Sequence, residues 1–216
     1  MIARLLRILF PPKCVLCKNL LSDNETDLCH NCRINEQEYT TGKNRISFIA
    51  GWTTVWYYRG NVRSSILRYK FSNARSYAPV YGRLMAMKIL KDLPEDIDIL
   101  TWIPVSKFRR FTRGYDQVEL LANEIGKQIH ILPACHLVKI RNNPAQSSLK
   151  YPSQRRANVL GAYLAKHPEL LSGKRILLID DILTTSATAS ECAKTLLFAG
   201  AKDVYVASLA ATPHKK

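Results

Sequence analysis

The fold of this 216-residue chain is decided by one stretch, Arg175-Ile-Leu-Leu-Ile-Asp-Asp-Ile-Leu-Thr-Thr-Ser-Ala-Thr188. Its four consecutive aliphatic residues, Ile176 to Ile179, predict a strand that is buried on both faces. Asp180 and Asp181 follow where we expect the strand to end, and a run of small, mostly hydroxyl residues leads into a helix. Backbone N–H groups at such a helix start attract phosphate, while carboxylates accept from ribose hydroxyls or hold a metal-bound water. The stretch predicts a sugar-phosphate site.

The same stretch also fits an ordinary strand–turn–helix unit, in which the aspartates are cap and turn residues. This alternative explains one aspartate well and the second poorly, because a carboxylate there must be solvated, paired or liganded. A Walker-type phosphate loop is excluded, since the chain contains no Gly-Lys-Ser/Thr sequence.

Strands and helices alternate along the rest of the chain. Apolar runs predict strands at 52–59, 98–105, 137–141, 162–165 and 204–210, and helical spacing predicts helices at 61–69, 78–91 and 118–128. This order predicts an α/β fold with a doubly wound, mainly parallel sheet. Ligands of such sheets bind beyond the carboxyl ends of the strands.

A basic loop follows the strand predicted at 98–105. We expect it to lie near the acidic pair and to neutralise a pyrophosphate or another polyanion, with a solvated basic turn as the alternative. Its candidate residues are Ser106, Lys107, Arg109, Arg110 and Arg113. Residues 142–158 show turn chemistry without an apolar period, which predicts a long mobile loop that acts as a lid.

Four cysteines lie near the start of the chain, as Cys14-x-x-Cys17 and Cys29-x-x-Cys32. This spacing predicts a four-thiolate zinc site with a structural role, since four sulfur ligands leave no position open for substrate. Two disulfides are the alternative, but a chain without an export signal is expected where thiols stay reduced. We expect residues 1–40 to hold an amphipathic helix and a zinc finger, and residues 41–216 to form the larger domain.

The chain carries a formal net charge of +15, from 32 Lys and Arg against 17 Asp and Glu. Such an excess implies polyanionic partners, namely nucleic acid, a pyrophosphate substrate or both. The alternative is that the charge serves general solubility, although mixed charge would serve that as well. Cations interleaved with aromatic residues suit single-stranded nucleic acid, although many of these rings must belong to the core. The candidate nucleic-acid residues are Arg63, Arg68, Lys70, Arg155 and Arg156. No apolar run approaches membrane-spanning length, and we expect a cytoplasmic location.

The sequence Asp180-Asp181-Ile-Leu-Thr-Thr-Ser-Ala-Thr188 resembles the phosphoribosyl-pyrophosphate (PRPP) loop of type I phosphoribosyltransferases. The resemblance implies that the acidic pair holds the ribose and Mg²⁺ of PRPP. It also implies that the 5-phosphate is bound by Thr184, Thr185, Ser186, Ala187 and Thr188. The family usually has glycine where this chain has Ser186, and a serine there would either add a hydroxyl donor or crowd the site.

Over nearly the whole chain, the sequence resembles the ComF family of competence proteins, which join a zinc finger to a phosphoribosyltransferase-like domain. The resemblance is carried by the cysteine pairs, by Arg113-Gly-Tyr-Asp-Gln117, by Gln146 with Arg155-Arg-Ala-Asn158, and by the Asp180-Asp181 loop. The second motif commonly reads Arg-Gly-Phe-Asn-Gln, so Tyr115 and Asp116 are departures.

The resemblance implies a role in DNA uptake during natural transformation, with imported single-stranded DNA as the client. Some relatives are linked instead to the use of DNA as a nutrient. The implied partners are PRPP and other competence proteins, such as a DNA-uptake helicase or a membrane channel. Two functions follow: a DNA-handling protein with a PRPP-binding site, or an active phosphoribosyltransferase with an unknown acceptor.

Overall fold

The main sheet of the protein has four parallel strands. A computed structural model describes residues 11–40, 45–141 and 151–213. Within them the sheet has the order β1-β6-β5-β2, and every pairing in it is parallel. Its strands are β1 (Gly51–Tyr57), β2 (Ile99–Trp102), β5 (Arg175–Leu183) and β6 (Asp203–Ala211). The predicted α/β class with a mainly parallel sheet is confirmed.

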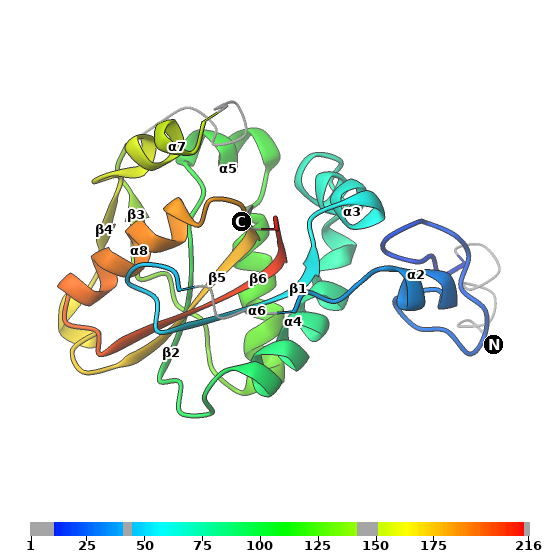
Figure 1. The fold of residues 1–216 in the computed structure, drawn as a ribbon, viewed down its shortest axis with the longest axis horizontal. Coiled ribbons are helices and arrows are strands. Elements are labelled where there is room, and N and C mark those ends of the chain that lie inside the picture. The colour runs from blue at the N-terminus through cyan, green and yellow to red at the C-terminus, as the bar shows by residue number, and fades with distance from the viewer. Residues whose placement is uncertain (1–10, 41–44, 142–150, 214–216) are drawn as a thin grey trace.

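Helices cover both faces of this sheet (Figure 1). One face is covered by α3 (Gly60–Phe71), α4 (Ala78–Asp92) and α6 (Gln117–Ile129), and the other by α8 (Ala187–Phe198). Two shorter helices, α5 (Lys107–Arg113) and α7 (Pro152–Val159), lie with α3 around the end of β6, in the upper part of Figure 1. The described residues also form the single 3₁₀ turns η1 (Arg75–Tyr77) and η3 (Pro168–Leu170).

Strand β5 lies between the two cores because its aliphatic side chains alternate between them. Leu177 and Ile179 pack in the cluster that contains α3, α4 and α6, while Ile176 and Leu178 pack in the cluster that contains α8. All four side chains are fully buried. Each contributes about 1.5–3 kcal/mol of burial free energy, so the register of β5 is strongly specified on both faces.

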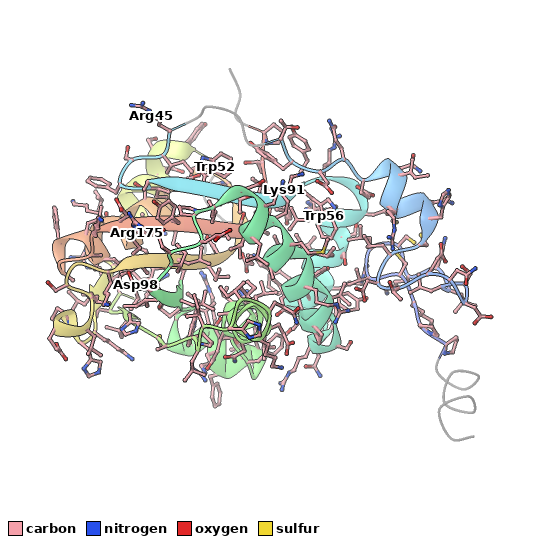
Figure 2. The ribbon with its side chains drawn as sticks, turned by 90° about the horizontal axis from the view of Figure 1, so that it is seen from below. Arg45, Trp52, Trp56, Lys91, Asp98 and Arg175 are labelled. Carbon is pink, nitrogen blue, oxygen red and sulfur yellow. The ribbon has the colours of Figure 1, made fainter. Side chains whose placement is uncertain are left out.

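The amino ends of β2 and β5 are tied together on the side of the sheet away from the acidic pair. The Asp98 carboxylate accepts a hydrogen bond from the backbone N–H of Arg175 at 2.8 Å, and the Asp98 N–H donates to the Arg175 carbonyl at 2.9 Å. Figure 2 shows the two residues at this end. The pairing fixes where both strands begin, so their carboxyl ends lie at the opposite edge.

Three predictions of local structure are wrong. Strand β5 does not end at Asp180 but continues to Leu183, because β6 pairs with it as far as Ala211. The basic loop after β2 folds instead into α5, whose start is capped by Ser106. The expected lid at 142–158 contains α7 in its second half, where Tyr151 caps the start of the helix; residues 142–150 lie outside the described residues.

Two of the predicted strands are not part of the main sheet. β3 (Leu137–Lys139) and β4 (Tyr163–Ala165) form a separate antiparallel pair. Tyr163 belongs to the same hydrophobic cluster as Cys192 and Leu196 of α8. The pair therefore covers part of the α8 face.

The cysteine-bearing segment packs directly on α3. Val15 and Leu16 are buried in one cluster with Val62 and Ile66 of α3. After the short helix α2 (His30–Asn35), the chain runs beside β1, where the Tyr39 N–H donates to the Val55 carbonyl at 2.9 Å. The helix predicted at the start of the chain falls outside the described residues. Within them, no helix has the length and apolar character needed to cross a membrane.

Candidate functional site

The four cysteines converge on one point. The sulfur atoms of Cys14, Cys17, Cys29 and Cys32 all lie within 4.8 Å of one another, and none of these cysteines forms a disulfide. A tetrahedral zinc ion with Zn–S bonds of about 2.3 Å sets its sulfur ligands about 3.8 Å apart, so the cluster is compatible with structural zinc. The backbone supports this arrangement, since the Lys18 N–H donates to the Cys14 carbonyl at 2.9 Å and closes the first turn.

The acidic pair lies in the last part of β5, and its members differ in environment. Asp181 is buried, and its two carboxylate oxygens accept from Lys70 Nζ at 2.8 Å and from Gln117 Nε2 at 2.8 Å. Asp180 accepts a hydrogen bond from the Asp181 N–H at 2.8 Å. Burial, helped by the charge of Asp181, raises the pKa of Asp180 to about 7, although Lys70 opposes the shift. One carboxylate is therefore paired, and the other can gain or lose a proton near neutral pH.

Ser186 takes a conformation that glycine adopts more readily. Its φ of 54° and ψ of 8° lie in the left-handed region, immediately before the first residue of α8. The residue is only 8% exposed, and its hydroxyl has no hydrogen-bond partner among the described residues. A buried hydroxyl without a partner is costly, and it adds a donor beside the N–H groups at the start of α8. This arrangement suits an anion such as phosphate.

The other predicted phosphate residues surround Ser186. Thr184 and Thr185 are half-buried in the turn between β5 and α8, and Ala187 and Thr188 are the first two residues of α8. The residue after β6 fixes the turn, because Thr212 Oγ1 donates to the Thr184 carbonyl at 3.0 Å. The structure thus joins these residues to the acidic pair in one short, anchored segment.

The predicted pyrophosphate residues lie on α5. Ser106 caps the helix by accepting from the Arg109 N–H at 3.4 Å, and Lys107 is the first helical residue. Arg109 is half-buried, and the exposed Arg110 pairs with Glu119 at 3.1 Å. Arg113 Nη1 donates to Gln117 Oε1 at 2.8 Å, which links α5 to the residue that holds Asp181. Of this set, Arg113 is connected to the acidic pair through Gln117.

Gln117 contacts the acidic pair, although the sequence assigned it no role. Besides its bond to Asp181, its carbonyl accepts from the Tyr69 hydroxyl at 2.7 Å. The available signal was its place at the end of the Arg113–Gln117 motif. Asp116, a departure from that motif, has a structural role: its carboxylate accepts from the Val118 N–H at 2.9 Å and caps α6.

The predicted nucleic-acid residues differ in exposure and in hydrogen-bond partners. Arg63 is exposed on α3, whereas Arg68 donates to the carbonyls of Val15 at 3.0 Å and Leu16 at 2.6 Å. Lys70 is engaged with Asp181. Arg155 and Arg156 both lie in α7, and Arg155 is half-buried.

The structure separates core rings from exposed rings. Trp56, Tyr69 and Tyr115 are buried. Four other rings, which we call the exposed ring set, lie on or beside α3, α5 and α7: Phe71, Phe108, Phe111 and Tyr151. The guanidinium of Arg113 lies 4.8 Å from the centre of the Phe71 ring. Aromatic and cationic side chains therefore share the helices that surround the carboxyl end of the sheet.

Curated relatives carry competence and DNA-utilization names. Competence protein F of Haemophilus influenzae is 30% identical over 155 residues, which span 67% of this chain and 66% of that protein, just under two thirds of its length. Competence protein ComFC of Streptococcus pneumoniae is 29% identical over 193 residues, or 89% of this chain and 79% of that protein. DNA utilization protein YhgH of Escherichia coli K12 is 26% identical over 166 residues, or 74% and 71%. The resemblance to the ComF family is confirmed.

No protein-family model matches the chain. Among solved structures, an allosteric regulatory enzyme of purine biosynthesis aligns with 18% identity and a TM-score of 0.44, over 66% of this chain and 29% of that one. A glutamine PRPP amidotransferase from B. subtilis aligns with the same identity and TM-score, over 66% and 30%.

We expect Ser186→Gly to stabilise the protein by about 1 kcal/mol, because glycine tolerates the left-handed backbone and leaves no unpaired hydroxyl. Ser186→Ala is the matched control, since it removes the hydroxyl but keeps a side chain on the same backbone. Urea unfolding of the three proteins measures the difference. A glycine variant less stable than wild type would contradict the strain at this position.

We also expect Asp180 to make stability fall as pH rises. The pKa of Asp180 is about 7 in the folded protein and near 4 in the unfolded chain, so between these values only the folded state holds the proton. The stability that Asp180 contributes by holding this proton is fully present below about pH 4. It is lost as the pH rises through 7, at a rate of at most about 1.4 kcal/mol per pH unit.

Asp180→Asn should therefore gain stability relative to wild type between pH 4 and pH 8, measured by unfolding at each pH. Asp98→Asn is the control, because backbone and lysine contacts lower the pKa of Asp98 and give the opposite dependence. A difference between Asp180→Asn and wild type that stays constant across this range would show that Asp180 titrates normally.

Proposed function

We propose that this chain, which resembles the ComF family, handles imported single-stranded DNA and carries a PRPP-binding site at the end of β5. The observation that carries the DNA proposal is the exposed ring set on helices that also bear many cations. Exposed rings stack on bases, and arginine and lysine contact phosphates without reading sequence. The net charge of +15 favours the same class of ligand.

The cations of this surface lie on the helices that carry the rings. They are Arg63 on α3, Arg75 in the turn η1 that follows α3, Arg109 and Arg110 on α5, and Arg155 on α7. The names of the curated relatives support a role in competence or DNA utilization. A cytoplasmic location and contact with a DNA-uptake helicase or membrane channel belong to the same proposal.

The PRPP site is supported by the chemistry at the β5–α8 turn. Asp180 and Asp181 provide carboxylates for ribose hydroxyls and Mg²⁺, and the buried Ser186 hydroxyl with the start of α8 provides donors for a phosphate. When bound, Mg²⁺ would neutralise the pyrophosphate.

An active phosphoribosyltransferase is the second candidate. It is favoured by Arg113, which is connected to the acidic pair through Gln117, since cations beside such a pair would stabilise a leaving pyrophosphate. Incubation with PRPP followed by product mass spectrometry would identify an acceptor.

We expect the exposed ring set to contribute stacking. Phe111→Ala should weaken binding of a dT oligonucleotide about fivefold or more, because one stacked base is worth about 1–3 kcal/mol. Phe198 is a similarly exposed ring at the far end of α8, so Phe198→Ala should leave this binding unchanged. Fluorescence anisotropy across a salt series measures both, and a dissociation constant insensitive to salt would contradict phosphate binding by the cations.

Calorimetry tests the PRPP site. Wild type should release or absorb heat with Mg²⁺ and PRPP, and the double substitution Asp180→Ala/Asp181→Ala should abolish it, because the ribose and metal contacts are lost. Absence of heat from the wild-type protein would refute PRPP binding.

Elemental analysis tests the cysteine cluster. We expect one zinc per chain, and we expect Cys14→Ser to lose the metal and several kcal/mol of stability, because structural zinc contributes directly to folding. Cys192 lies outside the cluster, so the Cys192→Ser variant should keep the metal. A folded wild-type protein free of metal would refute the zinc site.

A further inference from the structure

Helix α3 touches both the four-cysteine cluster and the acidic pair. In its last two turns, Arg68 Nη2 donates to the carbonyls of Val15 at 3.0 Å and Leu16 at 2.6 Å, which lie between the two cysteines of the first turn. Two residues later, Lys70 Nζ donates to Asp181 Oδ1 at 2.8 Å. One short stretch of helix therefore contacts both places.

The contact with the cysteine-bearing segment is built into the core. Val15 and Leu16 are both buried, so their carbonyl oxygens need partners within the protein. Arg68 supplies a donor to both, and the fully buried Ser65, one turn earlier on α3, donates its hydroxyl to the Val15 carbonyl. Bonds to a charged donor are stronger than neutral ones, so Arg68 holds α3 firmly against this segment.

The other side of the last turn of α3 is fixed to α6. The Tyr69 hydroxyl donates to the Gln117 carbonyl at 2.7 Å, and the Tyr115 hydroxyl donates to the Tyr69 carbonyl. Gln117 in turn donates to Asp181 Oδ2 at 2.8 Å. Both donors to Asp181 thus depend on where the end of α3 lies.

We propose that Arg68 is a positioning residue that holds α3 on the cysteine-bearing segment, so that Lys70 and Gln117 stay on Asp181. Through this contact the cysteine cluster sets the affinity of the acidic site. If the end of α3 shifts, Lys70 and Gln117 no longer hold the two oxygens of Asp181 in place, and the acidic pair loses the fixed geometry in which it would bind Mg²⁺ and ribose. The inference rests on the proposed PRPP binding at this site.

The test is Arg68→Gln, with Arg83→Gln as the matched control. Arg83 Nη2 pairs with Asp27 at 2.6 Å, so it also ties the cysteine-bearing segment to the larger domain, but from α4. Calorimetry with Mg²⁺ and PRPP should show about tenfold weaker binding for Arg68→Gln and a change below twofold for Arg83→Gln, with equal zinc content in both. Unchanged affinity in Arg68→Gln, or equal losses in both variants, would overturn the proposal.

A second measurement does not require PRPP. Amide hydrogen exchange in residues 180–183 should be faster in Arg68→Gln than in wild type or Arg83→Gln, because the contacts that hold this segment are loosened. If wild type gives no heat with PRPP, the proposed function fails, and hydrogen exchange alone decides the role of Arg68. If Arg68→Gln does not fold, Arg68→Lys replaces it in both measurements, with smaller changes in the same direction. Exchange identical to wild type would refute the connection.

Discussion

The burial of the Asp181 carboxylate is the constraint around which the site is organised. A buried charge is costly unless it is paired and hydrogen-bonded, and Asp181 meets this requirement with one cation and one amide. These donors come from α3 and α6, which lie far from β5 in the sequence. The need to hold this charge therefore ties three elements together at one edge of the sheet, and the surrounding tyrosine hydroxyls and backbone carbonyls keep the donors in place.

Much of the fold could be predicted because it depends on local pattern. The aliphatic run at Ile176–Ile179 identified a strand buried on two sides, and the cysteine spacing identified a cluster whose sulfurs do converge. The ends of elements were less predictable. The extension of β5 to Leu183 depends on pairing with β6, and such long-range pairing leaves no periodic signal in either strand.

Part of the site could be predicted because it also depends on local sequence pattern. The residues of the β5–α8 turn are neighbours in sequence, so a motif could gather them. Gln117 and the engagement of Lys70 arise from tertiary contacts, and a basic residue at the end of a helix gives no sign whether it faces solvent or a carboxylate. Arg68 is similar: its charge suggested a nucleic-acid contact, whereas its guanidinium meets buried carbonyls.

The pairing of Glu38 and Tyr39 with β1 affects how readily the molecule aggregates through this strand. β1 is an outer strand of the sheet, and its neighbour on one side is β6. On its other side, Glu38 forms a bridge with Trp56, and the Tyr39 N–H donates to the Val55 carbonyl. An uncovered outer strand offers unpaired backbone groups to other chains and promotes aggregation. The segment that follows the cysteines thus also shields this outer strand of the sheet from self-association.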